Sequence, residues 1–259
     1  MKILITNDDG IEAEGIISLT KRISKDEDVY VVAPEKKLHG IGTNVTFDRP
    51  IKIEEYPLNL GEKKSFKISG TPADCVILAK DVLIGQFDLL ISGINDEPNI
   101  GDDVRFSGTL GACIEATFSG ITSFGISLDY SREIRIVKNI YDGAAEFSFR
   151  FIRFIENNKI PKGIFLNINF PNVEIDRING IKFVPLGRRQ YYDRVHRITN
   201  PYNEEFYWIG GKMIPEQKED IIKSVLNEEY IAITPMSVDN TSYKFLEEMI
   251  SKWKIAFPQ

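Results

Sequence analysis

The first ten residues constrain the fold more than any other stretch of the chain. Ile3, Leu4 and Ile5 form an unbroken apolar run, which is typical of a strand buried on both faces. The run ends abruptly at Asn7-Asp8-Asp9-Gly10. Adjacent carboxylates at the end of a buried strand are costly unless a positive group neutralises them. Because open α/β sheets bind ligands at the carboxyl ends of their strands, we hypothesise a metal site built on Asp8 and Asp9.

The apolar patterns that follow predict an α/β fold. A helical face over residues 16–23 separates the first strand from a second one at 28–33, which makes a βαβ unit with parallel strands. We therefore expect a Rossmann-like three-layer core with a mostly parallel sheet. The other expected strands are 66–69, 88–92, 124–128, 163–170, 181–185 and 230–234, and the other expected helices are 71–82, 110–118, 134–157, 220–226 and 243–253.

Two local patterns predict details of this core. Thr71-Pro72 begins an apolar helical pattern, so Thr71 is expected to cap a helix that starts at Pro72. Residues 44–47 and 51–54 are predicted to form a strand pair about Arg49-Pro50.

The regular alternation of strand and helix ends near Pro185. The stretch 186–215 is rich in Arg, Tyr, Trp and Gly and predicts an irregular arm or a hairpin. We expect a catalytic core over residues 1–185. Residues 186–259 are expected to form a C-terminal arm with an oligomerisation element and a terminal helix.

Composition excludes some function classes. The net charge of the 259 residues is −6, which argues against a surface for a nucleic-acid polymer. Cys75 and Cys113 lie far apart in apolar patterns, so they are interpreted as buried thiols. No apolar run is long enough to span a bilayer, and the chain starts directly with a strand. We expect a cytoplasmic protein with no membrane partner.

Three further features are expected at the same sheet edge as Asp8 and Asp9. Asn95 ends another buried strand, and an amide oxygen beside carboxylates suits Mg²⁺, Mn²⁺ or Ca²⁺. Ser107-Gly108-Thr109 precedes an apolar helix and can form an anion cradle of backbone N–H groups and hydroxyls. His39 follows the second strand and can be a fourth metal ligand. Each feature also has a plainer interpretation when it is taken singly. Asn95 can be a turn residue, Ser107 or Thr109 can cap the helix, and His39 can be a surface histidine.

The chain resembles the SurE-type survival-protein nucleotidases, which are metal-dependent phosphatases of nucleoside monophosphates. The match is collinear and covers nearly the whole chain. The matching stretches are 3–10, 31–34, 69–76, 88–95, 99–104, Ser107-Gly108-Thr109, 166–171, Gly187-Arg188-Arg189 and 233–235.

The resemblance implies a 5′-nucleotidase, a phosphoric monoester hydrolase in which a metal-activated water attacks the phosphate. It implies one divalent ion per subunit, Mg²⁺ or Mn²⁺, held at Asp8, Asp9, Asn95 and the position of His39. Asp8 and Asp9 would be the catalytic residues. Asn95 and Ser107-Gly108-Thr109 would meet the phosphate of the nucleoside monophosphate. It also implies a C-terminal arm exchanged within a dimer, which often forms a tetramer.

Two departures from the family pattern bear on activity. The family usually has Ser where this chain has His39, and a small or basic residue followed by Gly where it has Asp96-Glu97. The alternative hypothesis is therefore that the protein is a non-enzymatic or weakly active relative that binds nucleotide and metal. A receiver-like domain is disfavoured because it needs an Asp after its third strand, where this chain has Ser92-Gly93-Ile94-Asn95, and because the chain is too long. A haloacid-dehalogenase-type phosphatase is disfavoured because its second acid comes two positions after the first, whereas Asp8 and Asp9 are adjacent.

Overall fold

The computed structural model describes residues 1–130, 139–189, 191–192, 194–213 and 220–256. Its central sheet contains β1 (Lys2–Thr6), β2 (Asp28–Pro34), β3 (Ile53–Glu55), β4 (Lys64–Ile68), β5 (Leu89–Asn95), β6 (Thr122–Leu128), β7 (Ile164–Phe170), β8 (Gly180–Phe183) and β13 (Tyr230–Ser237). Their order is β3-β4-β2-β1-β5-β6-β7-β13-β8. Only the β3–β4 and β7–β13 pairs are antiparallel, so the predicted mostly parallel sheet is confirmed.

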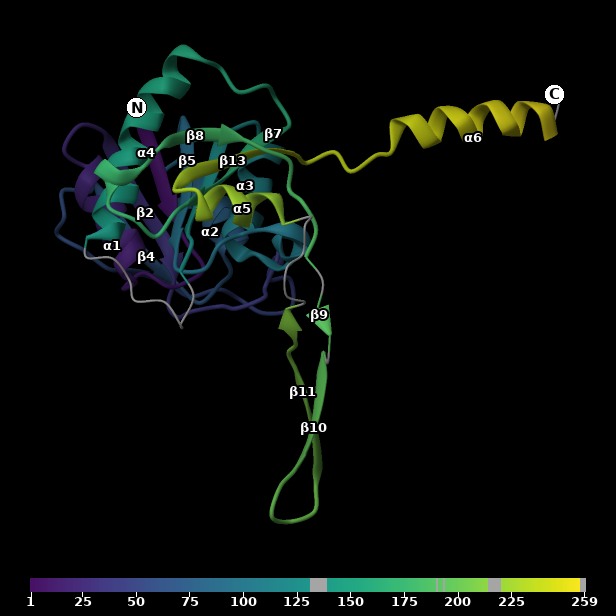
Figure 1. Ribbon diagram of the computed structural model, residues 1–259. Coiled ribbons are helices and arrows are strands. Elements are labelled where there is room, and N and C mark those ends of the chain that lie inside the picture. Colours follow the sequence, from purple (N-terminus) through teal and green to yellow (C-terminus); the bar gives the residue numbers. More distant parts are fainter. Residues whose placement is uncertain (131–138, 190, 193, 214–219, 257–259) are drawn as a thin grey trace.

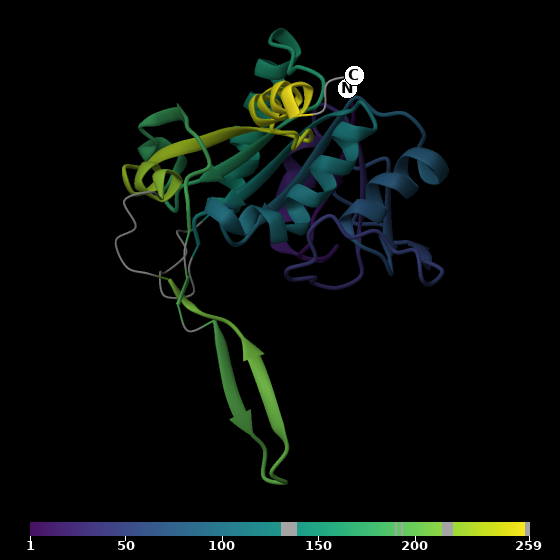
Figure 2. The ribbon, with the colours of Figure 1, turned by 90° about the vertical axis from the view of Figure 1, so that its right-hand side faces the viewer.

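Helices cover both faces of this sheet (Figures 1 and 2). Helices α1 (Glu14–Ile23) and α4 (Ile140–Asn157) pack on one face with Ile3 and Ile5. Helices α2 (Pro72–Leu78) and α3 (Gly108–Phe118) pack on the other face with Leu4. All three strand residues are fully buried, and each contributes about 1.5–3 kcal/mol by leaving water. The expected three-layer core is confirmed. Shorter turns of helix occur at Ala79–Leu83, Gly101–Phe106 and Ile175–Arg177.

The start of α2 follows the sequence prediction, whereas the preceding loop does not. Asp74 N donates to Thr71 Oγ1 at 3.1 Å, and Thr71 N donates back to the Asp74 carboxylate at 2.8 Å. The same carboxylate also accepts from Thr46 N at 3.0 Å and from Thr46 Oγ1 at 2.6 Å. Residues 44–47 are thereby tied to the helix start and form no strand. The predicted strand pair is wrong, and β3 pairs with β4 instead.

The C-terminal part leaves the core and then returns to it. After β8 come β9 (Tyr191–Tyr192), β10 (Val195–Thr199), β11 (Glu205–Ile209) and β12 (Lys212–Met213). The β10–β11 hairpin projects from the body (Figure 1). Helix α5 (Ile221–Asn227) and β13 rejoin the core, while α6 (Tyr243–Ala256) projects separately. The boundary expected at residue 185 stays a prediction. The expected helix start at 134 lies outside the described residues.

Two composition-based expectations concern thiols and membranes. Cys75 and Cys113 are buried free thiols, as predicted. Among the described residues, no helix combines the length and the apolarity needed to cross a membrane.

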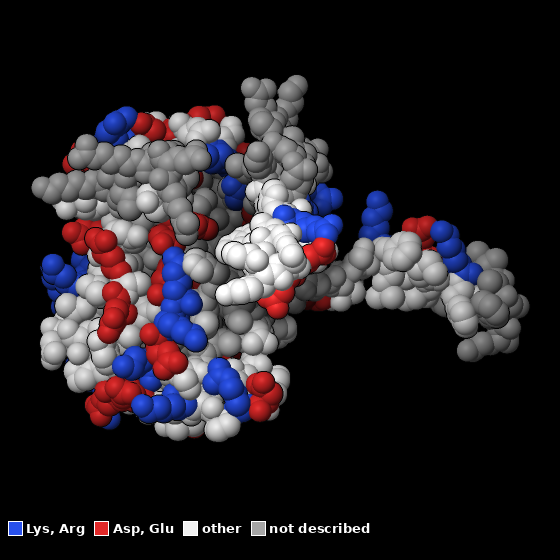
Figure 3. Space-filling view, turned by 90° about the horizontal axis from the view of Figure 1, so that it is seen from below, with Lys and Arg blue, Asp and Glu red and all other residues white. Residues whose placement is uncertain are grey.

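On the face from which the hairpin projects, basic and acidic side chains are interspersed (Figure 3).

Candidate active site

The turn after β1 is closed by its own side chains. Asn7 Nδ2 donates to the Gly10 carbonyl at 2.8 Å, and Gly10 N donates to Asn7 Oδ1 at 3.1 Å. Gly10 has a φ of +100°, where a side chain is strained. The backbone of Asp8 and Asp9 is therefore held in one orientation at the carboxyl end of β1.

Asp8 is buried against the first turn of α3. Thr109 Oγ1 donates to Asp8 Oδ1 at 2.6 Å. A Cβ on Gly108 would lie 2.8 Å from Asp8 Cβ and 2.9 Å from Asp8 Oδ2, so only glycine allows this approach. Burial raises the pKa of Asp8, while the Thr109 hydroxyl and backbone N–H act in the opposite direction. The start of α3 thus stabilises a carboxylate that has lost most of its water.

Asp9 turns to a different partner. Its Oδ1 lies 2.5 Å from Lys37 Nζ, which also lies 2.8 Å from Asp96 Oδ2. Burial raises the pKa of Asp9 to about 6, with Lys37 opposing that shift and the charges of Asp96 and Asp8 adding to it. Lys37 therefore joins the end of β1 to the end of β5.

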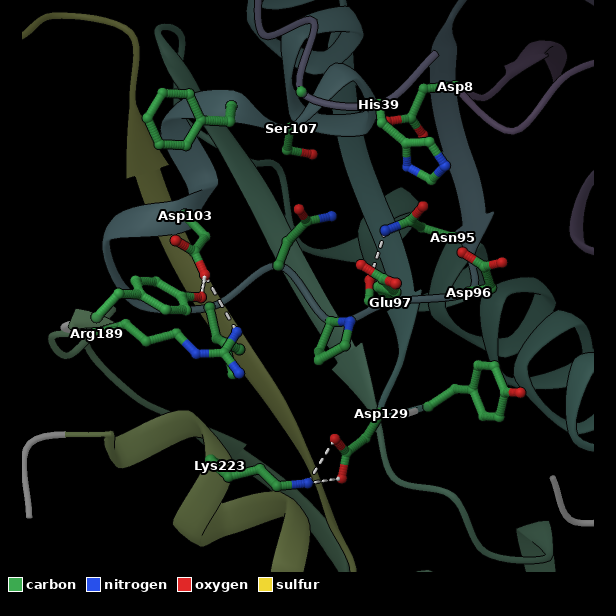
Figure 4. A pocket seen from close by; sticks show the side chains of 17 residues that line it. Asp8, His39, Asn95, Asp96, Glu97, Asp103, Ser107, Asp129, Arg189 and Lys223 are labelled. Atoms are coloured by element: carbon green, nitrogen blue, oxygen red, sulfur yellow. Dashed lines mark hydrogen bonds and ion pairs between the residues drawn. The ribbon is translucent and has the colours of Figure 1, made fainter. Parts of the chain in front are cut away.

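A cavity of about 610 Å³ brings several predicted site residues together (Figure 4). Asp8, His39, Asn95 and Ser107 line it, whereas Asp9, Gly108 and Thr109 do not. The other lining residues are Gly40, Asp96, Glu97, Pro98, Asn99, Ile100, Asp103, Phe106, Asp129, Tyr130, Arg189, Tyr191 and Lys223.

Ser107 and Thr109 take different positions in the predicted anion cradle. Ser107 Oγ accepts from Leu110 N at 3.1 Å and so caps α3, which leaves its O–H free to donate into the cavity. The hydroxyl of Thr109 is fully buried and donates to Asp8. Thr109 therefore orients a carboxylate, and the phosphate contacts of this stretch stay a prediction.

Asn95 and His39 line the same cavity as Asp8. Asn95 Nδ2 donates to the Glu97 carbonyl at 2.5 Å, and Figure 4 shows the amide oxygen pointing towards Asp8 and His39. His39 is exposed. Among the described residues, no group of three or more His, Cys, Asp or Glu side chains is placed to hold a metal ion on its own. The donor set of Asp8, Asn95 and His39 fits a divalent ion chemically, and its role as a metal site stays a prediction.

The cavity carries more negative than positive charge. Five carboxylates line it, from Asp8, Asp96, Glu97, Asp103 and Asp129. Asp96, Asp103 and Asp129 have ion-pair partners in Lys37, Arg189 and Lys223. Within the described ranges, Asp8 and Glu97 have none. An anion that entered this cavity would therefore meet a net negative charge.

The far end of the cavity contains Asp129 and Lys223, which the sequence did not point to, beside Arg189 and Tyr191. Lys223 Nζ from α5 lies 2.6 Å from Asp129 Oδ2, and Asp129 directly follows β6. Tyr191 donates a hydrogen bond to Asp103, which also pairs with Arg189 at 3.2 Å. The position of Asp129 after a buried strand was a usable signal, whereas Lys223 lies far away in the sequence.

A buried amide network holds the loop after β5. Asn99 N donates to Asn169 Oδ1 at 2.8 Å, and Asn99 Nδ2 donates to Ser127 Oγ at 2.7 Å. The Asn99 carbonyl accepts from Asn167 Nδ2 at 2.7 Å. Polar residues at 167 and 169 within an apolar strand were the available signal. The network fixes the residues that separate Asn95 from the far end of the cavity.

Comparisons with known proteins agree with the geometry. Residues 3–193 match the family described as Survival protein SurE. The chain is 36% identical to a protein of Thermosipho africanus named 5′-nucleotidase SurE, over 98% of each chain. It is 35% identical to the protein of that name from Desulforamulus reducens, over 96% of this chain and 97% of that one. The crystal structure of the SurE protein from Aquifex aeolicus is similar, with a TM-score of 0.81, 32% identity and coverage of 96% and 98%. The resemblance inferred from the sequence motifs is confirmed.

Proposed function

Because the chain belongs to the SurE family, we propose that it is a metal-dependent 5′-nucleotidase that releases phosphate from nucleoside monophosphates. The observation that carries this proposal is the position of the buried Asp8 carboxylate. It lies between an acidic cavity and the start of α3. A phosphate dianion would be repelled from these carboxylates unless a cation joined them.

The residues that would hold the ion are Asp8, Asp9, Asn95 and His39. They offer carboxylate and amide oxygens and an imidazole nitrogen, which is a set suited to Mg²⁺ or Mn²⁺. When bound, a divalent ion would offset the negative charge of the phosphate and make water more acidic.

The remaining steps fall to side chains and backbone at the start of α3. The Ser107 O–H and the N–H groups of the helix start would donate to the phosphate oxygens, which gain charge during the reaction. Water would attack phosphorus as the ester P–O bond breaks, and the proton that the water gives up would end on the nucleoside oxygen, so that the nucleoside leaves as an alcohol. Asp8 and Asp9 are the candidates for taking the proton from the attacking water. Thr109 acts by keeping Asp8 in position.

We also propose that the hairpin and α6 pack against other copies of the chain in a dimer or tetramer. Both project from the body (Figure 1), and both expose large apolar side chains. Trp208 and Ile209 on β11 are 67% and 81% exposed, and Trp253 on α6 is 61% exposed. Such surfaces are costly in water unless another surface covers them.

The function is tested by phosphate release from AMP, GMP and CMP. Purified protein is assayed with Mg²⁺, with Mn²⁺ and with EDTA. We expect turnover with a metal and its loss with EDTA. Nucleotide and metal binding without phosphate release would instead identify a non-enzymatic relative, the outcome that His39 and Asp96-Glu97 leave open.

A further inference from the structure

Lys37 is bound by carboxylates from two different strand ends. Its Nζ lies 2.5 Å from Asp9 Oδ1, and 3.0 and 2.8 Å from the two oxygens of Asp96. Asp9 is 7% exposed at its side chain, and Asp96 is 33% exposed. The ammonium therefore sits between a buried acid of the proposed metal set and an acid on the rim of the cavity.

Backbone contacts fix the loop that carries Lys37. Leu38 N donates to the Asp8 carbonyl at 2.8 Å, and Ile11 N donates to the Pro34 carbonyl at 3.0 Å. A Cβ on Gly10 would lie 3.3 Å from the carbonyl carbon of Lys36, so the loop packs directly on the turn that carries Asp8 and Asp9. An ordinary surface ion pair is worth little because both long side chains must be ordered. Here the loop fixes the backbone of Lys37, so only the side chain must still be ordered.

We propose that Lys37 is a built-in counter-cation that competes with the divalent ion for Asp9 and pairs with Asp96 when the ion is bound. This inference rests on the proposed function, since it concerns the metal of that site. Without the ion, the ammonium balances two acids that would otherwise repel each other. With the ion in place, Lys37 offsets the charge of Asp96, which the substrate phosphate would otherwise meet at the rim of the cavity.

Competition and charge pairing predict a specific pattern of metal affinities. K37M removes the competitor and one positive charge, so Mn²⁺ should bind roughly tenfold more tightly. D96N leaves Lys37 with Asp9 alone and removes one negative charge, so Mn²⁺ should bind more weakly. Because the lysine causes part of the second effect, D96N should weaken binding less in the K37M background. K36M is the matched control, since Lys36 is an exposed neighbour and, among the described residues, the ion pairs with Asp9 and Asp96 are made by Lys37.

The test is a calorimetric titration of Mn²⁺ into the metal-free full chain without nucleotide. Wild type, K36M, K37M, D96N and K37M/D96N are compared, and K37R, which keeps the charge, should bind Mn²⁺ much as the wild type does. The melting temperature of each metal-free variant shows whether that variant is folded. If K37M alone is unstable, K37M/D96N takes its place in the comparison, because the double variant has no Asp96 carboxylate left without its lysine.

The competing outcomes separate this inference from the function. Unchanged or weaker Mn²⁺ binding by K37M, or additive effects of K37M and D96N, would overturn the role of Lys37 even if AMP is hydrolysed. Absence of Mn²⁺ binding in both the wild type and K37M would overturn it as well. If the Mn²⁺ affinities follow the predicted pattern but no phosphate is released from AMP, the role of Lys37 as counter-cation would stand and the proposed hydrolase activity would be rejected.

Discussion

Thr109 donates its hydroxyl hydrogen to Asp8 at 2.6 Å, across 101 positions of sequence. This bond joins the carboxyl end of β1 to the first turn of α3. It gives the buried carboxylate a fixed rotamer before any substrate arrives. Fixing a catalytic group in advance lowers the cost of ordering it during the reaction.

Replacing Thr109 by Val should damage activity more than stability of the fold. Val has nearly the same shape but cannot donate to Asp8, and loss of such an orienting partner typically lowers activity or metal affinity about 10–100-fold. The measurement is kcat/KM for AMP at saturating Mn²⁺. Thr43→Val is the control, because Thr43 is an exposed threonine of the neighbouring loop. Equal losses in the two variants would argue against the role of Thr109.

Gly108→Ala should abolish most of the activity. The new Cβ would lie 2.7 Å from Ile41 Cγ2 and 2.8 Å from Asp8 Cβ, so Asp8 or the start of α3 must move. Gly143→Ala in α4 is the matched control. Its Cβ meets Ile175 at an ordinary 3.5 Å, and the change should stabilise the helix by about 0.5–1 kcal/mol. Phosphate release and the melting temperature are measured for both variants. Wild-type turnover by Gly108→Ala would show that the contact with Asp8 can relax.

Asp8→Asn should stabilise the metal-free protein while it removes activity. Burial raises the pKa of Asp8, so the protonated form is favoured by the fold, and that stability is lost as pH rises from about 3.8 through the folded pKa. At neutral pH the neutral amide avoids this cost. A gain of about 1 kcal/mol corresponds to roughly 2–4 °C in melting temperature for a chain of this size. Melting curves at pH 5 and 8 should show the larger gain at pH 8. A variant less stable than the wild type at pH 8 would contradict the prediction.

Trp208→Ser/Ile209→Ser should lower the molecular mass of the assembly in solution. Both side chains are exposed on β11 of the hairpin, away from the core that the hairpin leaves. Light scattering after size-exclusion chromatography measures the mass. Phe47→Ser is the control, since Phe47 is 92% exposed in a loop of the core. A monomeric wild type, or an unchanged mass for the hairpin variant, would rule out hairpin-mediated assembly.

The sheet was predictable from sequence because its strands are buried on both faces. Ile3-Leu4-Ile5 must be apolar throughout, since Ile3 and Ile5 face one helical layer and Leu4 faces the other. The cap at Thr71 was predictable because it depends on residues only three positions apart. Residues 44–47 were mispredicted because Asp74, 28 positions from Thr46, holds them through hydrogen bonds.

The candidate site was predictable as a set of strand ends, but its contacts were not. Asp8, Asn95 and Ser107 follow from the rule that ligands gather at carboxyl ends of parallel strands. The partner of Lys37 lies 59 positions away at Asp96, and no local pattern indicates that pairing. The contact between the Thr109 hydroxyl and Asp8 was not predictable either, because its direction depends on how α3 packs against β1.

A metal mechanism centred on Asp8 is tested most directly by comparing metal-dependent phosphate release from AMP by the wild type and by Asp8→Asn. The wild type is stripped with EDTA, exchanged into metal-free buffer and given AMP before and after Mn²⁺ is added back. We predict no release before addition, release after it, and none from Asp8→Asn under either condition. Release of phosphate from AMP by stripped wild type, or by Asp8→Asn, would contradict a metal mechanism centred on Asp8.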